Sequence, residues 1–273
     1  MELHGAVVVV TGGGSGIGAA LVERITAEAP SAMVVVDQHD HTAARVRDQV
    51  AAKAPDVDVW HAAVDVADED QVQALVRDVE RRNGTIDLFC ANAGIGSAMG
   101  LDAPDEVWRR VMDVNVMSHL YAARALVPGW CERGRGHLLV TASAAGLLSN
   151  LGDAPYSVSK HAAVALAEWI SITYGGRGVG VSCLCPQGVR TPLLFGTDEA
   201  GGLGDGTLAT EVVKAQRILE PAEVAEVTVA ALTEDRFLIL PHEEVATYEQ
   251  ARATDRERWL GSMRRLQDRL DAT

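Results

Sequence analysis

Cysteine is scarce in this chain of 273 residues, and its spacing fits no metal or redox motif. The four cysteines, Cys90, Cys131, Cys183 and Cys185, form neither a CxxC pair nor a zinc-type set, so we expect no metal site. Three of them lie within apolar runs, where a thiol behaves as a small hydrophobic side chain. The pattern predicts free thiols in a reducing compartment.

Long hydrophobic runs are also missing. The first apolar run, residues 6–10, is too short for a signal-peptide core or a membrane span, and it leads directly into a glycine-rich turn. We therefore expect a buried first strand, no membrane partner and a cytoplasmic location.

Basic charge is in deficit, with 24 Lys and Arg against 38 Asp and Glu and a formal net charge of −14. Nucleic-acid binding needs clustered cations that displace counterions from phosphates, so we expect no nucleic-acid partner. Hydrophobic residues make up 48% of the chain, and no repeat or long linker interrupts it. The composition predicts one globular domain with a sizeable core.

Short apolar runs alternate with helical stretches, which is typical of a parallel sheet covered by helices on both faces. Strands are expected at 6–11, 33–37, 57–62, 88–91, 137–143, 179–185 and 237–240. Helices are expected at 16–28, 41–53, 69–83, 104–132, 154–175 and 221–232. We predict an α/β domain over residues 1–240 and a C-terminal helical extension of that domain over 241–273, helical at 243–270.

One segment, residues 191–217, mixes glycines with leucines and a phenylalanine. Glycines allow a loop to move, and the apolar side chains offer a lining for a covered ligand. We interpret the segment as a substrate lid, and the alternative is an ordinary surface loop.

A glycine-rich turn, residues 11–18, connects the first expected strand to the first expected helix. Glycines there allow a tight turn and close approach of the backbone to a pyrophosphate at the helix N-terminus. Asp37 follows the last glycine at the spacing at which an acidic residue binds the adenosine ribose hydroxyls. Because its carboxylate would repel the extra phosphate of NADP, and Ser15 and Gln38 bring no cation nearby, we expect NAD. A capping role in the next turn is the alternative for Asp37.

Tyr156 and Lys160 lie four residues apart in an expected helix, so their side chains share one face. A cation at that distance would lower the pKa of the phenol and equip it to exchange a proton with an alcohol. The pair alone is a weak signal, because a half-buried ring beside a solvated lysine is common on helices.

Further motifs occur in order along the chain, and together they resemble those of the short-chain dehydrogenases/reductases over nearly its full length. They are the glycine motif Gly12, Gly16 and Gly18, the pair Asp65 and Val66, the run Asn92, Ala93 and Gly94, and the tetrad Asn115, Ser143, Tyr156 and Lys160. The resemblance implies a single Rossmann-like, doubly wound domain with a seven-stranded parallel sheet in the order 3-2-1-4-5-6-7. It also implies reversible hydride transfer between a nicotinamide and a carbinol carbon.

The resemblance implies a role for each residue of the site. Tyr156 is the general acid/base, Lys160 assists it and binds the nicotinamide ribose, Ser143 holds the substrate oxygen, and Asn115 anchors a water. The expected cofactor contacts are Gly12, Ser15, Gly16, Ile17, Gly18, Asp37, Asp65, Val66, Asn92, Ala93, Gly94, Tyr156, Lys160, Pro186, Val189 and Thr191.

The chain departs from the family pattern at Gln187, where the family usually has glycine after proline. Its amide could face the substrate, or the backbone could simply accommodate the change. Leucines near the site suggest an apolar pocket for a hydrophobic secondary alcohol or ketone. The expected substrate contacts are Ala145, Leu147, Gln187, Leu193 and Leu194.

Other functions remain open from the sequence. A binding protein that senses NAD without turnover is one, and a sugar-nucleotide epimerase or dehydratase is another. Members of this family are commonly tetramers, so we expect a homotetramer or homodimer, with the C-terminal segment contacting either its own domain or a neighbouring subunit.

Overall fold

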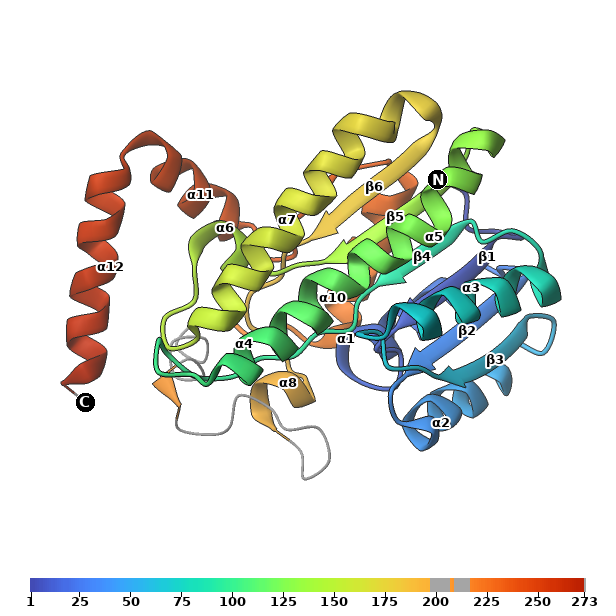
Figure 1. Ribbon diagram of the computed structural model, residues 1–273, viewed down its shortest axis with the longest axis horizontal. Helices are drawn as coiled ribbons and strands as arrows, with labels where there is room; N and C mark the ends of the chain where they lie inside the picture. The colour runs from blue at the N-terminus through green and yellow to red at the C-terminus, as the bar shows by residue number, and fades with distance from the viewer. Residues whose placement is uncertain (197–206, 209–216, 273) are drawn as a thin grey trace.

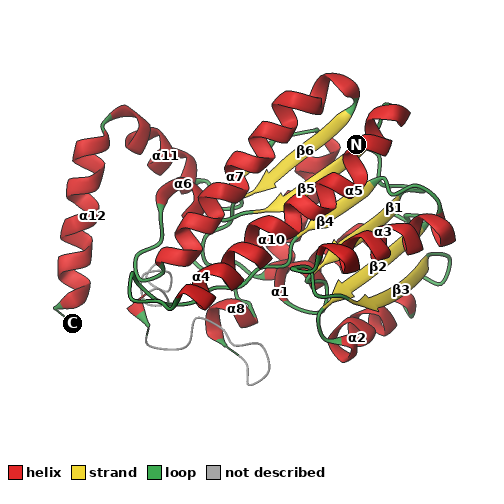
Figure 2. Cartoon of the chain, in the orientation of Figure 1, coloured by secondary structure: helices red, strands yellow, loops and turns green. Residues whose placement is uncertain are grey.

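The computed structural model describes residues 1–196, 207–208 and 217–272. Seven strands form one sheet in the order β3-β2-β1-β4-β5-β6-β7, and every neighbouring pair is parallel (Figure 2). This confirms the predicted fold class and strand order. The strands are β1 (Val7–Thr11), β2 (Ala32–Asp37), β3 (Asp58–Ala63), β4 (Leu88–Ala91), β5 (Gly136–Thr141), β6 (Val179–Leu184) and β7 (Leu238–Ile239).

Helices cover both faces of the sheet (Figure 1). One face carries α1 (Gly16–Thr26), α2 (Asp40–Ala51) and α10 (Pro221–Thr233). The other carries α3 (Glu69–Asn83), α5 (Ser118–Arg133) and α7 (Ala154–Tyr174). Shorter elements are α4 (Asp105–Met112), the π-helical turn η1 (Asp113–Met117), α6 (Ala145–Leu148), the 3₁₀ turn η2 (Gly175–Arg177) and α8 (Pro192–Phe195).

The strands are continuously apolar because both of their faces are buried. In β1, Val7 and Val9 join the core beneath α3, α5 and α7, while Val8 and Val10 join the core beneath α1, α2 and α10. Side chains alternate across a strand, so a run of valines feeds two cores at once. The strands' carboxyl ends meet at one edge of the sheet.

The helix expected at 104–132 is interrupted in the structure. It consists of α4, the π-helical turn η1 and α5, and Asn115 lies within η1. A π turn widens the helix locally and occurs often at functional sites. Sequence periodicity did not reveal this change of hydrogen-bonding pattern.

The C-terminal segment is helical as predicted, but it is divided in two. Helix α11 (Glu244–Thr254) is followed by α12 (Arg256–Asp271), and Asp255 between them caps α12 by accepting a hydrogen bond from the backbone N–H of Arg258. Helix α12 stands away from the sheet (Figure 1). The predicted lid begins with α8, and most of 191–217 lies outside the described residues. No helix in the described part of the chain is long and apolar enough to cross a membrane.

Candidate active site

The turn between β1 and α1 requires glycine at defined positions. A β-carbon on Gly18 would lie 2.1 Å from the carbonyl oxygen of Gly12, and one on Gly12 would lie 2.9 Å from the Cα of Ala93. Gly12 also has a φ of +63°. Ser15 is the N-cap of α1, yet its side chain makes no capping hydrogen bond, and the first turn carries no acidic residue. This helix terminus therefore fits a pyrophosphate.

An anion and a cation flank the next part of the turn. Asp37 Oδ2 accepts a hydrogen bond from the Gly14 N–H at 3.1 Å, and Oδ1 accepts one from the His39 N–H at 3.2 Å. Arg45, which comes from α2, donates from Nη2 to the Gly14 carbonyl at 2.8 Å. The sequence neighbours of Asp37 gave no sign of this cation, which the fold supplies.

Asp65 and Val66 line the same cavity as Asp37. The Asp65 carboxylate accepts two hydrogen bonds from the Arg110 guanidinium, at 3.1 and 3.2 Å. One of its oxygens also accepts from the backbone N–H of Ala67 at 3.0 Å. Arg110 thus pairs with this carboxylate, and the Asp65 backbone N–H donates to Gln71 Oε1 at 3.0 Å.

Polar side chains tie together the ends of three strands. Thr11 Oγ1 accepts from the backbone N–H groups of Asn92 and Ala93, at 2.9 and 3.2 Å. The Asn92 side chain donates to the Thr11 carbonyl at 3.0 Å and accepts from the Thr141 hydroxyl at 3.1 Å. The ends of β1, β4 and β5 are thereby held in one arrangement beneath the glycine turn.

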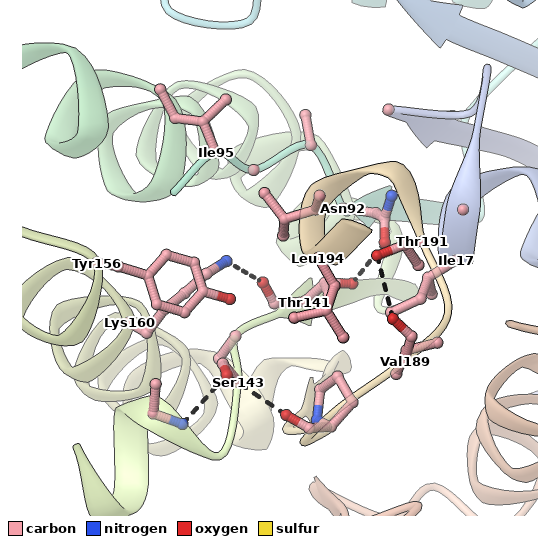
Figure 3. Close-up of a pocket in the computed structure, with 18 of the residues that line it drawn as sticks. Ile17, Asn92, Ile95, Thr141, Ser143, Tyr156, Lys160, Val189, Thr191 and Leu194 are labelled. Carbon is pink, nitrogen blue, oxygen red and sulfur yellow. Dashed lines mark hydrogen bonds between the residues drawn. The ribbon is translucent and has the colours of Figure 1, made fainter. Parts of the chain in front are cut away.

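Ser143, Tyr156 and Lys160 come together on the other side of this junction (Figure 3). The ammonium of Lys160 donates to the Thr141 carbonyl at 2.9 Å and lies 5.5 Å from the centre of the Tyr156 ring. Ser143 follows β5, and its Oγ accepts from the Ala145 N–H at 3.1 Å. A phenol, a hydroxyl and an ammonium therefore face one cavity.

The structure contradicts the expected lowering of the Tyr156 pKa. Burial raises the pKa of this phenol to about 12, hydrogen bonding to Ser143 opposes the rise, and the Asp153 carboxylate adds to it. Burial also lowers the pKa of Lys160 to about 8. The sequence-based expectation is wrong because it did not account for desolvation, which is the largest cause of the shift.

Asn115 is fully buried behind the cavity instead of lining it. Its side-chain oxygen accepts from the Ile95 N–H, and its amide donates to the Ile95 carbonyl and to Ser159 Oγ, each at 2.9 Å. The residue thus links the loop after β4 to α7. Its expected role in anchoring a water stays a prediction.

Asp153 is a site residue that sequence reasoning missed. Its carboxylate is 1% exposed and caps α7 by accepting from the Tyr156 N–H at 3.1 Å. The same carboxylate accepts from the N–H groups of Ser97 and Ala98, each at 2.8 Å, and from the Ser97 hydroxyl at 2.6 Å. The cap three residues before Tyr156 is the signal that could have found it.

The glycine turn, Asp37 and the side chains of Ser143, Tyr156 and Lys160 open onto one cavity of about 1080 Å³. Every expected cofactor contact lines it, as do the expected substrate contacts Ala145, Gln187, Leu193 and Leu194. Leu147 does not line it, whereas the neighbouring Leu148 does, although both belong to the buried core. Gln187 Oε1 is buried there without a hydrogen-bond partner.

The cavity also has lining residues that the sequence did not predict as contacts. Arg45, His39 and His41 lie at the Asp37 end, and Tyr248, Trp259, Met263 and Leu266 come from the C-terminal helices. The apolar spacing of residues 259, 263 and 266 predicts a helix face, but only the fold shows what that face meets.

Comparisons with known proteins bear on this arrangement. The family model for short chain dehydrogenases matches residues 6–200. The chain belongs to that family. It is 35% identical to 1-deoxy-11-beta-hydroxypentalenate dehydrogenase of Streptomyces exfoliatus, over 89% of this chain and 86% of the relative. It is 31% identical to 3beta-hydroxysteroid dehydrogenase 2 of Eggerthella lenta, over 82% of this chain and 86% of that protein.

A solved structure agrees with the family assignment. The short chain dehydrogenase/reductase from Burkholderia phymatum, determined in complex with NAD, superimposes with a TM-score of 0.83 at 30% identity. The match covers 94% of this chain and 96% of that one. This chain is therefore an oxidoreductase of the short-chain dehydrogenase family. Its relatives are named as dehydrogenases of hydroxyl compounds.

Proposed function

We propose that this protein is an NAD-dependent alcohol dehydrogenase/ketoreductase that interconverts a hydrophobic secondary alcohol and its ketone. One observation carries the proposal. The Ser143, Tyr156 and Lys160 side chains open onto the same cavity as the glycine turn and Asp37, so proton transfer and dinucleotide binding share one space. A nicotinamide bound there would supply the acceptor or donor of the hydride.

Tyr156 moves the proton in this proposal. With a pKa of about 12 the phenol is protonated near neutral pH, so it is ready to donate its proton to a ketone oxygen. In the reverse direction it must first release that proton to solvent, and the phenolate then takes the proton of the alcohol. Ser143 holds the same oxygen and stabilises charge that develops on it. Lys160, with a pKa lowered to about 8, lies close enough to the ring to influence this exchange.

The choice of NAD rests on Asp37. Its carboxylate lies beside Gly14 on the cavity wall, where like charge would repel the additional phosphate of NADP. The Burkholderia phymatum relative is described in complex with NAD, which supports the proposal. Gly12, Ser15, Gly16, Ile17 and Gly18 would hold the pyrophosphate, and Pro186, Val189 and Thr191 the nicotinamide end.

The substrate end has several apolar side chains beside the catalytic groups and Gln187. Leu148, Leu193 and Leu194 line it, and relatives named for a hydroxypentalenate and a hydroxysteroid support a bulky substrate. The unpartnered Oε1 of Gln187 is suited to accept a hydrogen bond from a donor on the substrate. We retain residues 191–217 as the proposed lid and a homotetramer or homodimer as the proposed assembly.

The free thiols fit a reducing compartment. All four cysteines are unpaired, and the Sγ atoms of Cys183 and Cys185 lie 3.8 Å apart without a covalent bond. This supports the proposed intracellular setting, in which such thiols stay reduced.

The test compares the wild type with Tyr156→Phe on a panel of secondary alcohols and ketones, followed by reduced-nicotinamide absorbance. We expect turnover to fall by at least about 100-fold, since general acid/base catalysis contributes roughly 100- to 10,000-fold. NAD affinity, measured by titration calorimetry, should change less than about twofold. Full activity in this variant would exclude the mechanism, and NAD binding without turnover of any alcohol or ketone by the wild type would favour the sensing function.

A further inference from the structure

Helix α12 presents a row of apolar side chains to the cavity. Trp259, Met263 and Leu266 follow each other at intervals of four and three residues, so they share one face of the helix. All three line the same cavity as Tyr156 and Ser143. We call these three residues the α12 stripe.

The upper end of the stripe is anchored to the body of the protein. The Trp259 ring lies 6.4 Å from the ring of Tyr248 on α11, and it packs against the main core. Asp255 caps the first turn of α12 and sets the angle at which the helix leaves α11. Beyond Trp259 the helix stands away from the sheet (Figure 1). Met263 and Leu266 line the cavity.

No residue of α12 is fully buried, although its stripe is apolar. Met263 and Leu266 are partly exposed, whereas apolar side chains of this size contribute about 1.5–3 kcal/mol each when they are fully removed from water. A large apolar ligand in the cavity would supply the missing contact. A short alcohol offers much less apolar surface for this contact.

The dimensions of the stripe indicate the size of such a ligand. Leu266 lies seven positions after Trp259, which corresponds to about 10 Å along a helix that rises about 1.5 Å per residue. Leu148, Leu151 and Leu194 line the same cavity as the stripe. A ligand that contacts the whole stripe would therefore be several fused rings long, and Ser262 and Arg269 add polar groups to the same wall.

We propose that α12 forms the far wall of the substrate pocket and makes this enzyme selective for multi-ring, apolar secondary alcohols over short ones. The inference rests on the proposed function, since it assumes that an alcohol reacts at Tyr156. Trp259, Met263 and Leu266 are the specificity-determining residues, and they act by contact with the part of the substrate remote from the reacting carbon.

The test uses a double variant, Met263→Ala/Leu266→Ala, with Leu260→Ala as its matched control. Leu260 lies on the same helix, is 39% exposed and does not line the cavity. The probes are a tetracyclic hydroxysteroid and 2-butanol, each assayed with NAD. We expect the double variant to lower kcat/KM for the hydroxysteroid about tenfold, mainly through KM, and to leave 2-butanol and NAD binding within twofold. Leu260→Ala should change neither.

Four outcomes would overturn the inference. In the first, the wild type prefers 2-butanol; in the second, the double variant behaves like Leu260→Ala. In the third, the double variant loses kcat/KM equally for both alcohols. In the fourth, analytical ultracentrifugation shows a loss of oligomeric mass in the double variant alone. The last outcome would make the stripe an interface with a second copy. The proposed function would instead be refuted if the wild type binds NAD but oxidises neither alcohol and reduces neither of the corresponding ketones.

Discussion

Asp153 should position Tyr156 without taking part in proton transfer itself. One buried carboxylate caps α7 at the Tyr156 N–H and also holds the backbone N–H groups of Ser97 and Ala98. Replacing Asp153 with alanine removes all of these acceptors at once. The start of α7 and the loop after β4 would then lose the group that joins them.

The size of the effect follows from these contacts. Loss of a helix N-cap costs about 1 kcal/mol, and each buried N–H left without a partner costs about 1–3 kcal/mol. Two such N–H groups and the cap together give a loss of about 3–7 kcal/mol in the free energy of unfolding for Asp153→Ala. Asp153→Asn keeps one acceptor oxygen in nearly the same place, so we expect it to lose about half as much.

Urea unfolding followed by circular dichroism measures the change, with Asp68→Ala as the control. Asp68 caps α3 through the N–H groups of Asp70 and Gln71, but it is exposed to solvent, so its loss should cost only about 1 kcal/mol. We also expect kcat of Asp153→Ala to fall at least tenfold under conditions in which it remains folded. Equal losses of stability in Asp153→Ala and Asp68→Ala, or an unchanged kcat, would refute the positioning role.

Two further predictions concern charge. Asp37→Ala should weaken NAD binding and raise kcat/KM for NADP at least about tenfold, because Arg45 remains beside Gly14. This gain should vanish in the double variant Asp37→Ala/Arg45→Ala. It should persist in Asp37→Ala/Arg47→Ala, because Arg47 does not line the cavity. The pKa of Lys160 is lowered to about 8, so between about pH 8 and the ordinary lysine pKa of 10.5 the unfolded chain binds more protons than the folded one. The free energy of unfolding of the wild type should therefore rise with pH across that window, relative to that of Lys160→Met. Denaturation curves of both proteins at each pH measure the difference. If the two free energies change with pH in parallel, the pKa of Lys160 is not lowered.

The fold and much of the site could be predicted because their signals are local. Runs such as Val7–Thr11 are apolar at every position, which indicates a strand buried on both faces. The glycine turn, Asp37, Ser143, Tyr156 and Lys160 could be found because each has a fixed place relative to a strand or helix. Their meeting at one edge of the sheet follows from parallel topology.

The parts that could not be predicted depend on contacts between distant segments. Arg45 reaches Gly14 only because α2 packs beside the turn, and the α12 stripe faces the cavity only because the chain bends at Asp255. The pKa of Tyr156 was predicted with the wrong sign, because spacing reveals a neighbouring charge but not the degree of burial. Leu147 and Leu148 are equivalent by composition, and only the turn of α6 decides which of them faces the cavity.

The π-helical turn η1 has a consequence for the register of the long helix that contains it. A π turn accommodates one residue more than an α-helical turn, and each residue rotates an α-helix by about 100°. If Asp113–Met117 formed a regular α-helical turn with the same residues, α4 would turn by about that angle relative to α5. Asn115 could then no longer meet Ile95 and Ser159 together. The extra residue in η1 thus sets the rotation at which the Asn115 amide meets both the loop after β4 and helix α7.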